Sequence, residues 1–287
     1  MVHLIGGDMK SIFDGMDELI YDALLLGSHQ NLKQKSTCAK LSATEDRIKN
    51  IEPLVTDMYA RIRRNWTGRK PSSSNWKLRR PSELNPNNRS AEVLLERAIV
   101  ILSKRGLLDN WYNQMPIASG LLDSSSDKRA AIDWVHIEQE RLELIELKWA
   151  SDTPLYAIFE ILRYALAYLF CFTNRELFDF QDLPTMNITQ IKLTTLAPHE
   201  YYSYCDLSWL AAALNPVINA LYREESDGFL SCEFNCSSFP INFKLLFETG
   251  GDVLALHDLP VDHPSIQLLL NALCNQHPAW EPKSNSR

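Results

Sequence analysis

The residues of this sequence most able to do chemistry are Asp133, Glu146 and Lys148, two carboxylates and an amine in one short stretch. Residues 131–137 and 142–149 are rich in Ile, Val, Leu and Trp and flank a short polar break. Two apolar runs around a polar break are typical of two β-strands joined by a tight turn. The stretch therefore predicts a β-hairpin that carries all three groups.

The register of this hairpin determines where the charged side chains lie. If Gln139 and Glu140 form the turn, Asp133 faces Glu146 across the strands, with Cβ atoms about 4.5–5.5 Å apart. Lys148 shares the face of Glu146, because side chains two positions apart on a strand point the same way. Opposed carboxylates repel, and burying them is costly unless they are paired or hold a cation. The pattern favours a divalent cation between the carboxylates.

This Asp–x12–Glu–x–Lys pattern resembles the PD-(D/E)XK nuclease superfamily over about residues 90–172. Asp133 and Glu146-Leu147-Lys148 match its motif, and Ile132 stands at a position where Pro is common in the superfamily. The resemblance implies a metal-dependent nuclease that hydrolyses phosphodiester bonds, with DNA as the substrate and Mg²⁺ or Mn²⁺ as the metal. Asp133, Glu146 and the carbonyl of Leu147 would hold the metal. Lys148 would orient the attacking water or stabilise charge on the phosphate.

The superfamily resemblance also points to a glutamate on the helix before the hairpin as a further metal ligand. Residues 90–105 predict that helix, with Ser90 as N-cap and Gly106 at its end. Glu96 fits the role best and Glu92, one turn earlier, is second. Acidic residues near a helix start also complement the helix dipole, which is an ordinary alternative. On the helix after the hairpin, Glu160 and Tyr164 lie one turn apart, and a structural hydrogen bond is the favoured interpretation.

Residues 61–80 form a basic segment with eight Lys or Arg and no acidic residue. The whole chain carries −7, so the rest of it carries −15. Segregated positive charge with interleaved tryptophans suits phosphate contact and base stacking. The alternative is a solvated linker whose tryptophans anchor it to the core. The candidate nucleic-acid-binding residues are Arg63, Arg64, Trp66, Arg69, Lys70, Trp76, Lys77, Arg79 and Arg80.

The composition is ordinary for a globular protein, with 45% hydrophobic and 23% charged residues. No uninterrupted run of about 18 apolar residues predicts a membrane span, and the first ten residues do not resemble a signal peptide. We therefore expect a cytoplasmic protein without a membrane partner. The six cysteines show no C-x-x-C spacing, so neither a disulfide framework nor a zinc site is expected. The oligomeric state is open, a homodimer included.

The order of predicted elements favours an α/β or α+β fold, with a restriction-endonuclease-like mixed sheet flanked by helices. We expect a helical N-terminal extension at 1–66, a basic linker rich in Pro, Ser and Asn at 67–89, and a nuclease-like core at 90–287. The extension should hold a helix over 9–27 and another from Ser42, with Pro53 causing a kink or a late start. Later elements are strands at 111–117, 187–195, 228–235 and 241–248, a hairpin at 241–256, and helices at 207–223, interrupted near Pro216, and at 265–275.

Two non-enzymatic interpretations stay open beside the nuclease. The same fold can serve as a nucleic-acid-binding or assembly module without catalysis. Alternatively, the three charges of the hairpin form a buried ion network. Metal binding separates the interpretations, because a nuclease should bind Mg²⁺ or Mn²⁺ at the hairpin and an ion network should not.

Overall fold

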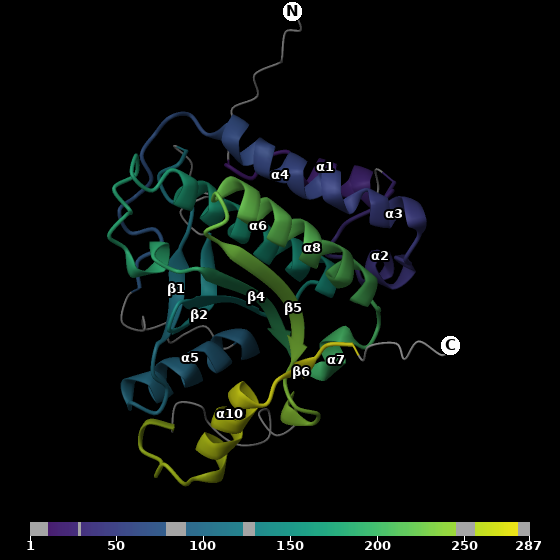
Figure 1. Ribbon diagram of the computed structural model, residues 1–287. Helices are drawn as coiled ribbons and strands as arrows, with labels where there is room; N and C mark the ends of the chain where they lie inside the picture. The colour runs from purple at the N-terminus through teal and green to yellow at the C-terminus, as the bar shows by residue number, and fades with distance from the viewer. Residues whose placement is uncertain (1–10, 28–29, 79–89, 123–129, 245–255, 281–287) are drawn as a thin grey trace, which may run out of the picture.

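The computed structural model describes residues 11–27, 30–78, 90–122, 130–244 and 256–280. Within these ranges, six strands form one mixed sheet in the order β1-β2-β3-β4-β5-β6 (Figure 1). The antiparallel meander β1–β2–β3 continues into parallel β4 and β5, and β6 pairs antiparallel with β5. The predicted mixed sheet flanked by helices is confirmed. The strands are β1 (Trp111–Pro116), β2 (Ala131–Glu138), β3 (Arg141–Leu147), β4 (Gln190–Ala197), β5 (Ser231–Ser238) and β6 (His277–Pro278).

Two helices connect the parallel strands and cover one face of the sheet. α6 (Pro154–Thr173) joins β3 to β4, and α8 (Ser208–Glu225) joins β4 to β5 (Figure 1). Thr153 caps α6 by accepting the N–H of Tyr156 at 3.1 Å, with Pro154 at the first position. Among the described helices, α6 is long and apolar enough to cross a membrane, but most of it is buried inside the protein. The central helix of a layered fold has the same composition.

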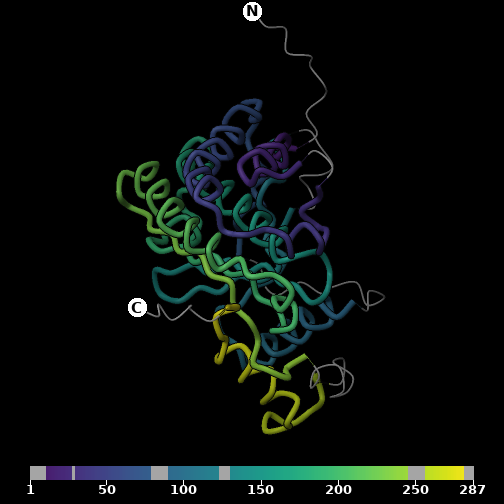
Figure 2. The backbone as a smooth tube through the Cα atoms, turned by 90° about the vertical axis from the view of Figure 1, so that its right-hand side faces the viewer, coloured from purple at the N-terminus to yellow at the C-terminus, as the bar shows by residue number. Residues whose placement is uncertain are grey.

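The N-terminal helices form a further layer outside α6 and α8. They are α1 (Met16–Ala23), α2 (Lys35–Lys40), α3 (Glu45–Lys49) and α4 (Ile51–Asn65). Figure 2 shows this layer at one end of the molecule and α10 (Pro264–Cys274) at the other. Buried residues of the extension, such as Ile20 and Val55, belong to the same hydrophobic cluster as Ile158 of α6. The extension therefore shares one core with the sheet.

Some predicted boundaries in the extension are wrong. The helix expected over 9–27 is limited to α1, and α2 was not expected. The predicted cap at Ser42 is replaced by Thr44, whose hydroxyl accepts the N–H of Arg47 at 3.3 Å. Pro53 lies in the first turn of α4, so the late start was the correct alternative, because proline fits a helix only where no backbone bond is lost.

The other face of the sheet is covered by α5 (Ala91–Lys104) and α10 (Figure 1). Ser90 caps α5 as predicted, accepting the N–H of Val93 at 3.4 Å. Gly106 follows the helix with φ of 69°, a left-handed conformation that glycine adopts without steric cost. Trp134 and Ile145 of the hairpin pack in the hydrophobic cluster on this side. The hairpin is thus held between helices on both faces.

Two predictions for the C-terminal half are wrong. α8 continues through Pro216, which lies on the exposed side of the helix, where water can satisfy the carbonyl that proline leaves free. Residues 241–244 form a turn and helical backbone instead of a strand, and 245–255, the rest of the predicted hairpin, lie outside the described residues. β5 pairs with β6 at Ser237 and Ser238 instead. The short α7 (His199–Tyr202) and η2 (Pro184–Met186) lie in the connections around β4.

One disulfide forms that the spacing of the cysteines does not predict. Cys38 of α2 and Cys205, after α7, form a disulfide with Cα atoms 5.9 Å apart. The two residues are 167 positions apart in sequence, so no local spacing signals their pairing. Packing of the extension on the core brings them together. Cys232 and Cys236 are buried thiols, as expected of cysteines in a strand.

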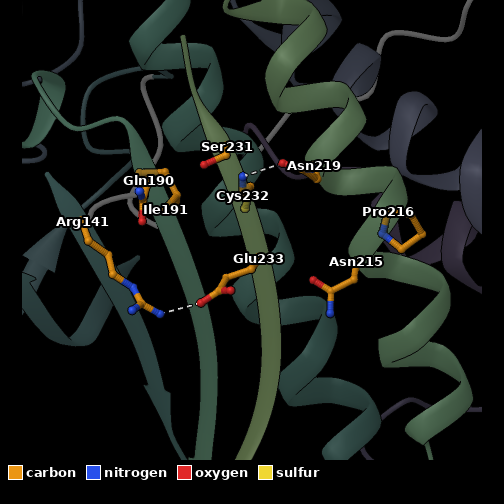
Figure 3. A pocket seen from close by; sticks show the side chains of 9 residues that line it. All are labelled: Arg141, Gln190, Ile191, Asn215, Pro216, Asn219, Ser231, Cys232 and Glu233. Carbon is orange, nitrogen blue, oxygen red and sulfur yellow. Dashed lines mark hydrogen bonds and ion pairs between the residues drawn. The ribbon is translucent and has the colours of Figure 1, made fainter. Parts of the chain in front are cut away.

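The outer edge of β5 is protected by side chains where β6 does not reach. Asn215 of α8 donates to the carbonyl of Phe234 at 2.7 Å and accepts the N–H of Phe234 at 2.7 Å. Asn219 accepts the N–H of Cys232 at 3.1 Å (Figure 3). The two amides replace a neighbouring strand, which leaves fewer free groups for another chain to pair with.

Asn215→Ala should therefore destabilise the protein. Both backbone groups of Phe234 lose their partner, which costs about 1–3 kcal/mol for each group that stays unsatisfied. The measurement is urea unfolding followed by circular dichroism. Asn187→Ala, at an exposed position with only a local contact, should change stability by no more than about 0.5 kcal/mol. Equal effects of the two substitutions would show that Asn215 does not support the edge.

Candidate active site

The hairpin has the predicted register, with Glu138 opposite Arg141 and Trp134 opposite Ile145. Beyond Trp134 and Ile145, no further backbone pair joins β2 and β3 in the described residues. At this point the N–H of Leu147 donates to Oδ2 of Asp133 at 2.9 Å. The carboxylate takes the place of a strand carbonyl where the two strands separate. The hairpin therefore opens at Asp133 and Glu146, the predicted carboxylate pair.

Lys148 lies in a buried ion network beside the opening. Its Nζ is 2.8 Å from Oε1 of Glu146 and 2.7 Å from Oε2 of Glu160 on α6. Burial lowers the pKa of Lys148, but the two carboxylates outweigh it and raise this pKa above its usual value. Glu160 also accepts a long hydrogen bond of 3.4 Å from the hydroxyl of Tyr164. Lys148 is thus a fixed, permanently charged ammonium.

Glu146 has one carboxylate oxygen that the protein leaves without a partner. Its side chain is 5% exposed, and the buried Oε2 accepts no hydrogen bond from any described residue. Burial raises the pKa of Glu146 well above its usual value, and the nearby Asp133 raises it further. A buried acceptor without a donor is costly, so this oxygen is suited to contact a cation that is not part of the chain.

The surroundings of Asp133 raise its pKa as well. Burial raises the pKa of Asp133, Lys148 lowers it, and the carboxylate of Glu96 raises it again. Glu96 itself is buried, and its Oε1 accepts from Asn113 Nδ2 at 3.1 Å and from Gln114 Nε2 at 2.9 Å. Burial raises the pKa of Glu96 as well. Asp133 is thus near charges of both signs, with Lys148 lowering its pKa and the carboxylates of Glu96 and Glu160 raising it.

Glu92, the second candidate on α5, has a different place. Its Oε1 accepts the N–H of Trp149 at 2.8 Å and the hydroxyl of Ser151 at 2.5 Å. Glu92 thus holds the loop that follows Lys148. Glu96 is the glutamate of α5 whose charge reaches Asp133.

Three residues of the site do not follow from the sequence pattern. Asn113 and Gln114 orient Glu96, and Glu160 reaches Lys148, where only a structural role was expected. The sequence signal for Glu160 was its place one turn before Tyr164 on the helix after the hairpin. For Gln114 no signal exists, because its left-handed backbone, with φ of 51°, is uncommon for a residue other than glycine.

The donor set fits a hard cation only in part. Within the described residues, no three His, Cys, Asp or Glu side chains are grouped to hold a metal ion. Asp133 and Glu146 supply two carboxylates, and the main chain of Leu147 faces β2, because its N–H points to Asp133. Mg²⁺ is commonly bound through one or two carboxylates and keeps several waters. That mode is compatible with the carboxylates of Asp133 and Glu146 and the carbonyl of Leu147, and Oε2 of Glu146 has no partner among the described residues.

The tryptophans of the basic segment pack in the core. Trp76 is fully buried, with its ring 5.2 Å from that of Tyr168. Trp66 packs edge-on against Phe170 and Phe178 at 5.4 and 5.6 Å. The assignment of Trp76 to base stacking is therefore wrong in this structure, because a ring without exposed surface offers no face to a base.

The cations of the basic segment lie mostly at the surface. Arg64, Arg69 and Lys77 are exposed. Arg63 is 3.7 Å from Glu225, and Lys70 is 2.8 Å from Asp179. Arg79 and Arg80 lie outside the described residues.

The basic segment is anchored at some distance from the hairpin carboxylates. Its tryptophans contact Tyr168 and Phe170 of α6, whereas Lys148 contacts Glu160. Eight to ten helical residues at 1.5 Å each separate these points by about 12–15 Å.

Comparisons with protein-family profiles, with curated proteins and with solved structures found no match to this chain. Membership of the PD-(D/E)XK superfamily therefore stays a prediction from the hairpin motif. The function has to be inferred from the residues at the hairpin opening.

Lys148→Met should strongly destabilise the protein. Glu146 and Glu160 would stay buried without their cation, which costs about 3–5 kcal/mol when one partner of a buried pair is removed. The measurement is urea unfolding at pH 7.5. Lys49→Met is the control, because Lys49 pairs with Glu45 at 2.6 Å and both side chains are mostly exposed. That change should cost no more than about 1 kcal/mol. Similar losses for both variants would contradict the buried network.

Asp133→Asn should slightly stabilise the metal-free protein, by about 0.2–1 kcal/mol at pH 8, because it relieves the repulsion from Glu146. The pKa of Asp133 is raised in the folded state, so the native protein binds this proton more tightly than the unfolded chain does. The free energy of unfolding of wild type should therefore fall as the pH rises through the folded pKa of Asp133. It should rise again as the pH is lowered toward the ordinary pKa of an aspartate. Unfolding between pH 5 and 8 should show a flatter dependence for Asp133→Asn, and an unchanged slope would contradict the assignment.

Proposed function

We propose that this protein is a metal-dependent nuclease that hydrolyses phosphodiester bonds, with DNA as its substrate. The observation that carries the proposal is the hairpin opening. The pairing of β2 and β3 ends at Trp134 and Ile145, next to Asp133 and Glu146, and Lys148 is fixed alongside, while Oε2 of Glu146 has no hydrogen-bond partner among the described residues. Asp133, Glu146 and the carbonyl of Leu147 would hold Mg²⁺ or Mn²⁺. When bound, such a metal polarises a phosphoryl oxygen and lowers the pKa of a bound water.

The charge balance of the site supports this proposal. Glu146 and Glu160 contact the ammonium of Lys148, whose charge also acts on Asp133. Glu96 acts on Asp133 as well, and Arg97 lowers the pKa of Glu96. Burial is the main cause of the raised pKa values of Asp133, Glu146 and Glu96, and neighbouring carboxylates raise the pKa of Asp133 and Glu146 further. A divalent cation between Asp133 and Glu146 would offset that repulsion, which supports the proposed metal site.

Lys148 is suited to act on the substrate. Its ammonium stays charged and is held from two sides. It can therefore donate to a phosphate oxygen or to the attacking water with little further loss of side-chain conformational entropy. Glu160 keeps a hold on the ammonium when Glu146 is engaged by a cation. Glu96, fixed by Asn113 and Gln114, would complete the surroundings of the metal.

A non-catalytic nucleic-acid-binding or assembly module is the second candidate. It is favoured by the contact between Lys148 and Glu146, which satisfies half of the glutamate without any metal. It is also favoured by the lack of a three-carboxylate cluster among the described residues. Metal binding and cleavage separate the two candidates.

Wild type should cleave plasmid DNA in Mg²⁺ or Mn²⁺, and Asp133→Asn and Glu146→Gln should each abolish the cleavage. Mn²⁺ should raise the melting temperature of wild type, because free Mn²⁺ at 100 times its Kd adds about 2.7 kcal/mol to the free energy of unfolding. Neither variant should show this shift.

Glu96→Gln should reduce cleavage while leaving the metal-free melting temperature nearly unchanged. Glu143→Gln, on the same strand but the opposite face, is the control and should behave like wild type in cleavage. A wild type that neither melts higher with metal nor cleaves DNA or RNA is not a nuclease of this kind.

Joint replacement of Arg64, Arg69 and Lys77 by Ala should weaken duplex binding and reduce its salt dependence. Each lost phosphate contact lowers the slope of log affinity against log salt by about 0.9. Fluorescence anisotropy at several salt concentrations measures the slope. An unchanged slope would mean that the segment is a linker anchored by its tryptophans.

A further inference from the structure

A lysine of the N-terminal extension lies beside the candidate active site. The Nζ of Lys33 is 3.9 Å from the ring centroid of Tyr156, at the start of α6. The Nζ of Lys148 is 5.8 Å from the same centroid. The two ammonium groups therefore lie within about 10 Å of each other, the most that these two distances allow. Lys33 precedes Asp133 by a hundred positions, and no local motif connects them.

Several contacts fix the segment that carries Lys33. The hydroxyl of Thr153, the cap of α6, donates to the carbonyl of Leu32, and the N–H of Lys33 donates to Oδ1 of Asn31 at 2.8 Å. The disulfide of Cys38 ties the helix that follows to the core. The extension thus contacts the loop between Lys148 and α6.

The side chain of Lys33 is held loosely enough to change partners. Its Nζ is 3.2 Å from Oδ2 of Asp152, and the two side chains are 48% and 24% exposed. An ion pair at this exposure contributes little to stability. The contact therefore orients the ammonium over Tyr156 but does not prevent an exchange of Asp152 for a phosphate.

Other charges around Tyr156 do not offer the same possibility. A cavity of about 470 Å³ that Tyr156 helps to line is also lined by acidic residues, among them Asp17, Glu18 and Glu160. The cation that lines it, Arg163, is paired with Asp17. A phosphate would be repelled there and attracted toward Lys33, where the positive end of α6 adds to the attraction.

We infer that Lys33 is a substrate-binding residue that contacts a phosphate of the cleaved strand, close to the phosphate at Lys148. The inference rests on the proposed nuclease function and adds to it a role for the N-terminal extension. Successive nucleotides of one strand rise by about 3.4 Å, so the span between the two ammonium groups covers a few phosphates. Lys33 binds the backbone and takes no part in the chemical step.

The test compares Lys33→Ala, Lys33→Arg and Lys40→Ala with wild type on a short fluorescein-labelled DNA duplex in Mg²⁺. Lys40 is the matched control, an exposed lysine of the same extension. Lys33→Ala should raise KM about tenfold, as expected for one lost charge-assisted hydrogen bond, with kcat within about twofold of wild type. The slope of log KM against log salt should fall by about 0.9. Lys33→Arg and Lys40→Ala should behave like wild type.

Duplex binding without metal, measured by anisotropy, separates this inference from the proposed function. If wild type binds but does not cleave, the nuclease proposal fails, and a weaker affinity of Lys33→Ala than of Lys40→Ala still supports the phosphate contact. If Lys33→Ala matches wild type in KM, affinity and salt slope, Lys33 only pairs with Asp152 and the inference is overturned. A wild type that neither binds nor cleaves the duplex overturns both.

Discussion

The contact on which the site depends is the buried ammonium of Lys148 between Glu146 and Glu160. Burying either carboxylate without a cation would be costly. One ammonium cannot neutralise these two carboxylates and also the nearby Asp133. The arrangement therefore has a shortage of positive charge built into it. A fold selected only for stability would place apolar residues at such a position, since a well-packed apolar group is often as stable as a buried ion pair. These buried charges therefore support the proposed metal site.

The sheet explains why this shortage arises at one point. β3 continues to pair with β4 one residue past its end, where the N–H of Lys148 donates to the carbonyl of Leu196 at 2.9 Å. On its other side, β3 has already separated from β2, and Asp133 has taken the place of a strand carbonyl. Lys148 is thus fixed by the parallel side of the sheet, while Asp133 and Glu146 face the gap on the antiparallel side. β3 can therefore separate from its antiparallel neighbour β2 while it keeps its hydrogen bonds to the parallel neighbour β4.

The hairpin, its register and the flanking helices could be predicted from the sequence because each depends on local pattern. Alternation sets the register, Ser90 suits a helix start, and Gly106 suits a helix end. The contacts of Glu160 and of Gln114 could not be predicted, because they depend on how a helix is seated on the sheet and on one left-handed residue. Burial explains the error at Trp76, since a tryptophan among arginines has the same sequence pattern whether its ring lies in solvent or in the core. Long-range packing explains why the pairing of Cys38 with Cys205 could not be predicted.

The N-terminal extension is where local pattern fails most and where the structure adds most. Its apolar residues complete the core around α6, so it cannot be treated as a separate appendage to the sheet. Its segment around Leu32 is bonded to the cap of the same helix that carries Glu160. A change in the seating of the extension would therefore move Tyr156, Glu160 and Lys148 together. A ligand that contacts both Lys33 and Lys148, as proposed, would therefore contact the extension and the hairpin at once.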